Sequence, residues 1–376
     1  MEFSRRSFLR SAAIGTAAAS LEFPLAQLGW PEPRRTAHPS GAILLNSNEN
    51  AYGPLPAARA ALESGLSVAN RYPFGELDSI QDSIAKYHGV QRDQVQIGCG
   101  SSEVLRVAPH ACLDKGAKKL ITATPTFEAV AFYAKAYGVD PITVPLTKDY
   151  AHDLDAMLAK TGEDTGLIYI CNPNNPTGSL TRRKDLDAFL AKLPQSTYVL
   201  IDEAYHHFAK GAPDYTSYLE TPLTDNRIIV ARTFSKVYGL AGMRLGYSVA
   251  TAETTKNMLF PFQQLDNVNQ SVAAAGVASL NDDAAMHAAV TRNAKDRDEF
   301  MRQAAARGLT PIPSYCNFVM MDSGRPMQQV AEHFKKNGIL IGRHFPPMDT
   351  FVRISLGKPE EMKAFWRVWD QMPKAA

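Results

Sequence analysis

Short apolar runs that alternate with helical patterns are the feature of this sequence that most restricts its fold. Helical patterns cover about 101–114, 126–137, 181–193 and 203–208. The apolar runs are 94–98, 119–123, 142–146, 166–171, 198–202, 227–231 and 246–250. Such alternation is typical of strands that follow one another in the same direction, with helices as crossover connections. The sequence therefore predicts an α/β domain with a mainly parallel sheet.

The pattern changes after residue 250. A long charged helix is predicted at about 284–307, because Gly308 follows it as a C-cap, and further helices are predicted near 326–337 and from Pro359. Helices segregated from a few short strands indicate a smaller α+β domain. We expect a large domain over 70–258, a small C-terminal domain over 259–376, and an N-terminal arm over 28–69 that joins the small domain.

The first residues form a separate segment. Arg5 and Arg6 precede the weakly hydrophobic, Ala-rich stretch SAAIGTAAAS. This arrangement resembles a twin-arginine signal, which directs folded proteins across a bacterial membrane. We therefore expect residues 1–27 to be a signal peptide, and the mature protein to be periplasmic or otherwise exported. A cytoplasmic protein with a basic extension is the alternative.

The bulk composition argues against several kinds of partner. The chain has 376 residues and a formal net charge of +2, so no strong attraction to nucleic acid is expected. After the signal, no apolar run is long enough for membrane insertion. The four cysteines are widely spaced, which predicts no metal site and favours small buried side chains; they are Cys99, Cys112, Cys171 and Cys316.

Polar residues follow the predicted strands, where ligands of open α/β sheets bind. After the run 94–98, Ser101 and Ser102 begin a helix whose N–H groups could seat an anion, although a simple helix cap explains them equally well. After 119–123, Phe127 begins another helix and could stack on a flat ring, although a core aromatic is the commoner case. Each of these two signals is weak alone.

The later strand ends carry more specific patterns. NPNNPTG fixes an irregular loop that presents Asn175, and DEAY places Asp202 at the end of an apolar run with Tyr205 one helical turn further on. After 227–231 come the polar residues Thr233, Ser235, Lys236 and Arg244. One ligand explains the whole set, because pyridoxal phosphate (PLP) has a phosphate, a planar ring, a cationic ring nitrogen, a phenolate oxygen and an aldehyde.

The segments NPNNPTG, DEAY and TFSKVYGLAGMRLGY resemble the signature segments of the fold-type I, class I/II PLP-dependent aminotransferases. LNSNENAYGP, RYPF and FVRISLG extend the resemblance over nearly all of the chain after the signal, and within the family the chain is most similar to histidinol-phosphate aminotransferase. The resemblance implies a large domain with a mainly parallel mixed sheet and a small α+β domain.

The resemblance also implies roles for the residues at the strand ends. Lys236 would bind the cofactor's aldehyde and move the substrate's Cα proton, and a desolvated site beside Arg244 would lower its pKa. Asp202 would pair with the ring nitrogen, and Asn175 and Tyr205 would hydrogen-bond the ring oxygen. Phe127 would stack on the ring. The phosphate would be held by Ser101, Ser102, Thr233, Ser235 and Arg244.

Four further residues are implied by the same resemblance. Tyr72 would reach the phosphate of a neighbouring subunit, so the active unit would be a homodimer with shared sites. Arg353 would clamp the substrate carboxylate, a task suited to its planar fork. Arg343 would serve the donor's distal group, but it follows GI one residue later than in the enteric pattern. Tyr52 would line the substrate pocket.

The reaction implied is transfer of an amino group from an amino acid or amino-alcohol phosphate to a 2-oxo acid such as 2-oxoglutarate. The identity of the donor stays open, with aromatic or other apolar amino acids as alternatives, because export would separate the enzyme from the cytoplasmic histidine pathway. A PLP-dependent decarboxylase or lyase is a second interpretation, since no motif reports which bond at Cα breaks. A non-catalytic PLP-binding protein is a third.

Overall fold

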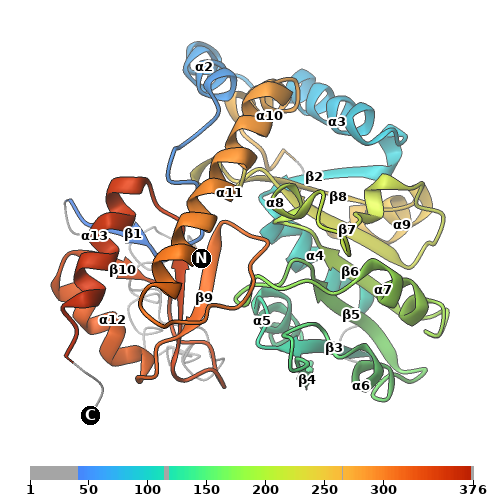
Figure 1. Ribbon diagram of the computed structural model, residues 1–376. Coiled ribbons are helices and arrows are strands. Elements are labelled where there is room, and N and C mark those ends of the chain that lie inside the picture. Colours follow the sequence, from blue (N-terminus) through green and yellow to red (C-terminus); the bar gives the residue numbers. More distant parts are fainter. Residues whose placement is uncertain (1–40, 114–117, 265, 374–376) are drawn as a thin grey trace, which may run out of the picture. The chain divides into compact units, whose positions relative to one another are not determined.

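Seven strands form the central sheet of the computed structural model, which describes residues 41–113, 118–264 and 266–373 (Figure 1). The strand order is β2-β8-β7-β6-β5-β3-β4. β8 runs antiparallel to both of its neighbours and the other pairs are parallel, which confirms the predicted fold class. The strands are β2 (Val95–Cys99), β3 (Lys119–Thr124), β4 (Ile142–Pro145), β5 (Thr165–Cys171), β6 (Tyr198–Asp202), β7 (Ile228–Thr233) and β8 (Leu245–Val249).

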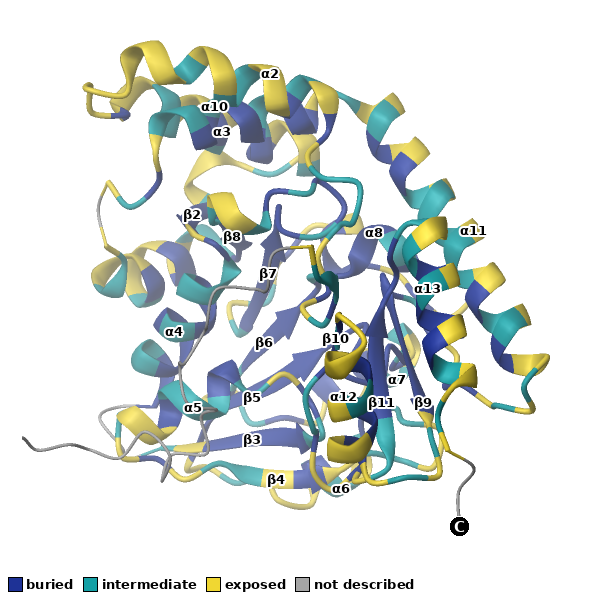
Figure 2. Cartoon of the chain, turned by 90° about the vertical axis from the view of Figure 1, so that its left-hand side faces the viewer, coloured by how far each residue is buried: buried dark blue, intermediate teal, exposed yellow. Residues whose placement is uncertain are grey.

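The sheet is buried on both faces, as the continuous apolar runs predict. Every residue of β5 is buried, and its side chains alternate between two hydrophobic clusters. Ile168 and Ile170 belong to one cluster, and Leu167, Tyr169 and Cys171 belong to the other. The inner strands are accordingly dark in Figure 2, whereas the edge strand β4 and the outer sides of the surrounding helices carry exposed residues.

The helices between the strands begin near the carboxyl ends of the parallel strands and so border one edge of the sheet. α4 follows β2, α5 follows β3, and the short α8 follows β6. Each helix predicted in this region is present and is two to five residues shorter in total than predicted. The helices of this region are α4 (Ser101–Cys112), α5 (Ala129–Ala136), α6 (Leu154–Leu158), α7 (Arg183–Leu190), α8 (His206–Ala209) and α9 (Ala252–Thr254).

Three helices form a group that the sequence analysis does not predict. They are α2 (Pro56–Gly65), α3 (Phe74–His88) and α10 (Gln270–Leu280), and α10 packs against both of the others. The contact between α2 and α10 is close at Gly65, where an added Cβ atom would lie 2.4 Å from Cβ of Ser271. The Ala-rich sequence of α10 lacks a clear polar face, so its period gives little signal.

The C-terminal residues form two small sheets with three helices. β9 (Phe318–Asp322) pairs antiparallel with β11 (Phe351–Ser355), and β1 (Ile43–Leu45) pairs in parallel with β10 (Ile339–Ile341). α11, α12 and α13 pack around a core that includes Phe300, Phe334 and Phe365. β1 thus joins the segment after residue 40 to C-terminal strands. The helices are α11 (Asp283–Ala305), α12 (Met327–Lys336) and α13 (Pro359–Asp370).

Two sequence-based expectations concern the limits of this fold. The chain from His38 to Ala376 clusters as one compact unit, so the boundary expected near residue 258 stays a prediction. The expected signal peptide, residues 1–27, lies outside the described residues. Within the described ranges, no helix combines the length and apolar character needed to cross a membrane.

Candidate active site

Lys236 lies just beyond β7, at the carboxyl end of a buried strand. Its Nζ donates a 3.1 Å hydrogen bond to the backbone oxygen of Asn48 and lies 5.4 Å from the centre of the Tyr205 ring. Burial, reinforced by the positive charge of Arg353, lowers the pKa of Lys236 from 10.5 to about 8. The cation that acts on Lys236 is therefore Arg353, and not Arg244 as the sequence suggested. A neutral amine, which attack on an aldehyde requires, is accessible near neutral pH.

Asp202 ends β6 and is almost completely buried, with 3% of its surface exposed. Its Oδ2 accepts a 2.9 Å hydrogen bond from the phenol of Tyr169, and its Oδ1 accepts a 3.1 Å bond from the backbone N–H of Ala204. Burial raises the pKa of Asp202 to about 6, while the two hydrogen bonds and Lys236 oppose that shift. The carboxylate has no cationic hydrogen-bond partner among the described residues and is suited to pair with a cationic ligand atom.

Tyr205 and Asn175 lie near Lys236 and Asp202 and contact residues from distant parts of the chain. The Tyr205 phenol oxygen accepts a 3.1 Å hydrogen bond from Nδ2 of Asn48. Asn175 Oδ1 accepts a 2.6 Å hydrogen bond from Nη1 of Arg353. The fold therefore links residues predicted to bind the cofactor with the arginine predicted to bind the substrate.

The residues predicted to hold a phosphate converge on Arg244. Its guanidinium donates hydrogen bonds to Oγ of Ser102 (3.2 Å) and Oγ of Ser235 (3.4 Å), and Oγ1 of Thr233 donates to Oγ of Ser235 (2.9 Å). At Gly100, directly before α4, an added Cβ atom would lie 2.2 Å from Nη2 of Arg244. Any side chain at position 100 would fill the space between the start of α4 and Arg244, which we call the cradle.

The backbone at the start of α4 completes this cradle. An added Cβ atom at Gly246 would lie 2.2 Å from the backbone nitrogen of Ser101. The first N–H groups of α4 therefore remain close to Arg244, and together with the dipole of that 12-residue helix they form an anion seat.

Cys99 is exposed beside the seat, so the interpretation of all four cysteines as buried residues is wrong for this one; all four are free thiols.

Arg353 lies on β11 and is buried, with 7% of its surface exposed. Besides Asn175, it donates a 2.8 Å hydrogen bond from Nη2 to the backbone oxygen of Asn46, while its buried Nε has no partner. Burial lowers the pKa of Arg353 to about 10, and the charge of Arg343 acts in the same direction. A buried guanidinium with an unused donor favours an anionic ligand.

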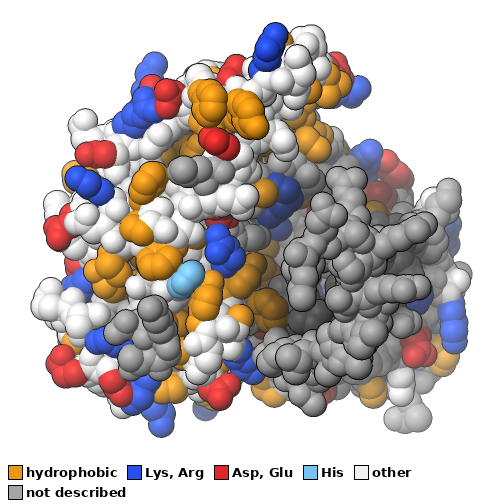
Figure 3. Space-filling model, turned by 180° about the vertical axis from the view of Figure 1, so that it is seen from behind, with side chains coloured by type: hydrophobic (Ala, Val, Ile, Leu, Met, Phe, Trp, Pro, Cys, Tyr) orange, Lys and Arg blue, Asp and Glu red, His pale blue; other side chains and the backbone are white. Residues whose placement is uncertain are grey.

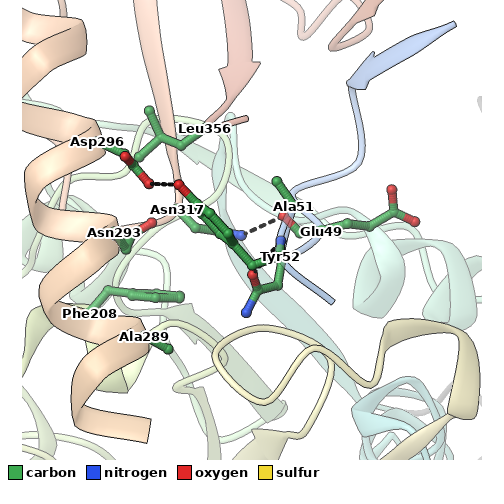
Figure 4. Close-up of a pocket in the computed structure, with 10 residues that line it drawn as sticks. Glu49, Ala51, Tyr52, Phe208, Ala289, Asn293, Asp296, Asn317 and Leu356 are labelled. Atoms are coloured by element: carbon green, nitrogen blue, oxygen red, sulfur yellow. Dashed lines mark hydrogen bonds between the residues drawn. The ribbon is translucent and has the colours of Figure 1, made fainter. Parts of the chain in front are cut away.

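Tyr52 contacts the helix α11 rather than Arg353 or Lys236. Its phenol donates a 3.0 Å hydrogen bond to Oδ2 of Asp296 (Figure 4). The guanidinium carbon of Arg292 lies 3.9 Å from the centre of the Tyr52 ring. Burial and the bond to Asp296 raise the pKa of Tyr52 to about 12. Tyr52 borders a cavity of about 20 Å³, and its predicted role in substrate binding remains a prediction.

Tyr72 and Phe127 are among the exposed large hydrophobic residues. Tyr72 is 76% exposed and its ring stacks on that of Phe74, with 5.7 Å between the centres. In the described part of the chain, Tyr72 makes no hydrogen bond with the other predicted site residues. Phe127 follows β3 and is 36% exposed, so its side chain is partly accessible. Both predicted roles stay predictions.

Arg343 follows β10 and forms an ion pair with Glu128. Its Nη1 also donates a 2.9 Å hydrogen bond to the backbone oxygen of His344. The Phe345 ring lies against both predicted substrate arginines, with 4.2 Å from its centre to the guanidinium carbon of Arg343 and 4.7 Å to that of Arg353. The two arginines are therefore neighbours.

Four residues that the sequence analysis did not single out contribute to the site. Tyr169 supports Asp202, Asn48 contacts both Lys236 and Tyr205, and Asn317 donates a 3.0 Å hydrogen bond to the backbone oxygen of Asn48. The fourth is Glu128. Two of these residues could have been noticed in the sequence: Tyr169 is a polar residue inside the apolar run GLIYIC, and Glu128 is an acidic residue directly after Phe127. Their hydrogen-bond and ion-pair partners, however, are visible only in the folded chain. Among the described residues, no cluster of His, Cys, Asp and Glu could hold a metal ion.

The chain belongs to the class I and II aminotransferases, because the family "Aminotransferase class I and II" matches residues 40–368. This family places the site described above in a PLP-dependent transaminase. It confirms the cofactor inferred from the strand ends and the reaction class implied by the resemblance.

Individual relatives carry two different names. The chain is 34% identical to a histidinol-phosphate aminotransferase of Moorella thermoacetica, over 89% of this chain and 86% of the relative. It is 36% identical to an aromatic amino acid aminotransferase of Corynebacterium glutamicum, over 88% and 93%. A solved histidinol-phosphate aminotransferase of Sinorhizobium meliloti, in complex with pyridoxal-5'-phosphate, superposes with a TM-score of 0.82 at 27% identity and covers 94% of this chain and 97% of that structure.

The residues present fit PLP. The glycine-lined cradle around Arg244 suits a phosphate, the buried carboxylate of Asp202 suits a ring N–H⁺, and the amine of Lys236 has the depressed pKa that attack on an aldehyde needs. These three groups lie at the carboxyl ends of β2, β6 and β7, the edge at which open α/β sheets bind ligands.

Proposed function

We propose that this aminotransferase takes its amino group from an amino acid whose α-carboxylate binds Arg353, and passes the group to a 2-oxo acid such as 2-oxoglutarate. The observation that carries the proposal is the buried Nε of Arg353, which has no partner although Nη1 and Nη2 are engaged by Asn175 and Asn46. A carboxylate can accept from such a fork with two oxygens.

Each residue has a defined task in this proposal. Bound PLP supplies an electron sink for the electrons left on Cα when its C–H bond breaks. Asp202 holds a negative charge for the ring nitrogen, and Tyr169 keeps one of its oxygens fixed by a hydrogen bond. Lys236 Nζ accepts the Cα proton and returns it, because its lowered pKa allows both protonation states near neutral pH. Arg353 orients the donor.

A donor screen tests the proposal. The protein loaded with PLP is mixed with single amino acids, with histidinol phosphate and with amines that lack a carboxylate, and the absorbance of the lysine-bound cofactor is followed. We expect amino acids to discharge the absorbance, and 2-oxoglutarate to restore it. If no amino acid does so while amines without a carboxylate do, the carboxylate site at Arg353 is wrong.

We further propose that the active unit is a homodimer in which Tyr72 reaches the phosphate seat of the partner. Apolar side chains on the segment that includes α2 and α3 support this, since Leu66, Val68, Tyr72 and Phe74 are all exposed large hydrophobic residues. Hydrophobic patches are also visible on the face in Figure 3. Exposed apolar surface of this kind marks association sites.

The proposed location is outside the cytoplasmic membrane, and histidinol phosphate is not the proposed main donor. The support comes from the sequence alone: Arg5 and Arg6 precede an Ala-rich, weakly hydrophobic stretch, and the catalytic motifs begin after residue 40. A twin-arginine route suits a cofactor that is inserted before export. The displaced position of Arg343 after GI also departs from the pattern of enzymes that use histidinol phosphate.

A further inference from the structure

The ion pair between Glu128 and Arg343 joins two ends of the site that are far apart in the sequence. Glu128 directly follows Phe127 and precedes α5, while Arg343 follows β10. Arg343 also lies against Phe345, the ring that contacts Arg353. The pair therefore stands beside the arginine proposed to hold the donor's α-carboxylate.

Gly342, directly before Arg343, packs against the backbone of Arg353. Its N–H donates a 2.9 Å hydrogen bond to the backbone oxygen of Arg353, and an added Cβ atom would lie 2.6 Å from that oxygen and 3.3 Å from Nε of Arg353. Position 342 has no room for a side chain. Arg343, one residue later, is instead directed to Glu128.

Both charges of the pair act on the pKa of Arg353. Arg343 lowers the pKa of Arg353 whereas Glu128 raises it, so the two side chains act on the same group with opposite signs. Without Glu128, two neighbouring arginines would present an uncompensated double positive charge. With Glu128, the region next to Arg353 carries a compensated pair.

We propose that Glu128 is a specificity-determining residue that makes the side-chain region of the donor site electrically neutral. It thereby shifts the preference of the site by a few-fold towards ligands with uncharged, apolar or aromatic side chains and away from ligands with a distal carboxylate or phosphate, the acceptor 2-oxoglutarate included. This inference rests on the proposed binding of the α-carboxylate at Arg353. A ligand with a distal anion has to displace Glu128 from Arg343 and then lies next to a displaced carboxylate, which is a repulsive element.

The size of the effect follows from the exposure of the pair. The Arg343 and Glu128 side chains are 38% and 45% exposed, so solvent screens their attraction. Exposed pairs of this kind shift equilibria by up to roughly fivefold, and a substitution at Glu128 should change ligand preference by that factor or somewhat more. The effect is one of selectivity between ligands and leaves the fold intact.

Binding of two unreactive carboxylates tests the proposal. Glutarate carries a second carboxylate, whereas 3-phenylpropionate carries an aromatic ring, and neither has an amino group that can react. Their dissociation constants for the PLP-loaded enzyme are measured by calorimetry for the wild type and for Glu128→Gln. We expect Glu128→Gln to bind glutarate roughly fivefold more tightly, with little change for 3-phenylpropionate.

Two further variants separate the specific effect from a general change of charge. Glu332→Gln removes an exposed carboxylate on α12 and should change neither dissociation constant. The double variant Glu128→Gln with Arg343→Gln should lose the gain in glutarate binding, because the released arginine is then absent. Turnover should show the same selectivity. The ratio of kcat/KM for glutamate to kcat/KM for phenylalanine should rise in Glu128→Gln, and it should stay at the wild-type value in Glu332→Gln and in the double variant.

The outcomes distinguish this inference from the proposed function. Equal changes for both carboxylates, or a glutarate gain that survives loss of Arg343, would overturn the role of Glu128 while leaving the carboxylate site at Arg353 in place. Failure of the wild type to bind either carboxylate, or binding of both that is undiminished in Arg353→Gln, would overturn the proposed site and the inference with it.

Discussion

The phenol of Tyr169 donates a 2.9 Å hydrogen bond to Oδ2 of Asp202, and both residues are buried on adjacent parallel strands. Tyr169 is fully buried in one hydrophobic cluster, so its hydrogen bond restrains the carboxylate at the strand end. The bond also opposes the effect of burial on the pKa of Asp202. The negative charge that PLP would require from Asp202 is thus supported by a side chain of the neighbouring strand.

The first prediction is that Asp202→Asn slows catalysis and raises the free energy of unfolding of the cofactor-free protein. Loss of the ring-nitrogen partner should slow the half-reaction by about 10³-fold or more, measured in stopped flow with an amino acid donor. The pKa of Asp202 is about 6 in the folded protein against an ordinary 3.8, so folded wild type loses stability as pH rises through that window.

The expected gain in stability depends on pH. At pH 8 cofactor-free Asp202→Asn should be more stable than wild type by up to about 3 kcal/mol, and the difference should vanish towards pH 4. Urea unfolding at both pH values measures it. Near-normal half-reaction rates, or a pH-independent difference in stability, would contradict the role given to Asp202.

The second prediction concerns the pKa of Lys236. Because the neutral amine is the reactive form, the rate of PLP incorporation should rise about tenfold per pH unit below pH 8 and level off above it. Borohydride should then fix the cofactor to Lys236, as seen by peptide mass spectrometry. Lys236→Ala should bind PLP without covalent fixation. A label on another lysine would refute the assignment.

The third prediction concerns Arg353. Arg353→Gln should reduce kcat/KM for amino acid donors by about 10²-fold, because two charge-assisted hydrogen bonds to the α-carboxylate are lost. An amine that lacks a carboxylate serves as the comparison and should be affected far less. Equal losses for both kinds of donor would mean that Arg353 acts on the cofactor or the fold and not on the carboxylate.

The fourth prediction concerns the shared site. Tyr72→Phe should weaken PLP retention, and mixing it with inactive Lys236→Ala chains should generate hybrid dimers. Each hybrid contains one site that combines Lys236 of one chain with Tyr72 of the other, and one site with both defects. Tight PLP binding should reappear in the hybrids after subunit exchange. A mixture that behaves as the sum of its two parent proteins would count against sharing.

The fifth prediction concerns location. Replacing Arg5 and Arg6 by lysine should leave the activity of the purified enzyme intact but keep the longer precursor in the cytoplasm, as read by cell fractionation and immunoblotting. Exclusive recovery of the wild-type protein from the cytoplasm would contradict export. Rescue of a histidine auxotroph by the exported form would contradict the proposed exclusion of histidinol phosphate as the main donor.

Much of the fold was predictable because its signals are local. The seven apolar runs coincide with the seven sheet strands to within a residue or two at each end, since strands buried on both faces require continuous apolar sequence. The helices α2, α3 and α10 were not predicted. Their stability depends on close packing with one another, as at Gly65 and Ser271. The alternation of apolar and polar residues that would reveal a helix is also weak in the Ala-rich segment of α10.

The sequence by itself determined the cofactor, because Asn175, Asp202 and Lys236 lie at the ends of successive parallel strands, whose carboxyl ends meet at one edge. Arg244 directly precedes the antiparallel β8 at that edge. The resemblance of these segments to the aminotransferases indicated the reaction class. Only the tertiary structure decided the partners: Tyr169 for Asp202, Asn175 for Arg353, Asp296 for Tyr52 and Glu128 for Arg343. These contacts join residues 33 to 244 positions apart. Hydrogen bonds and charges act through space over a few ångströms, so the chain order does not record which side chains meet.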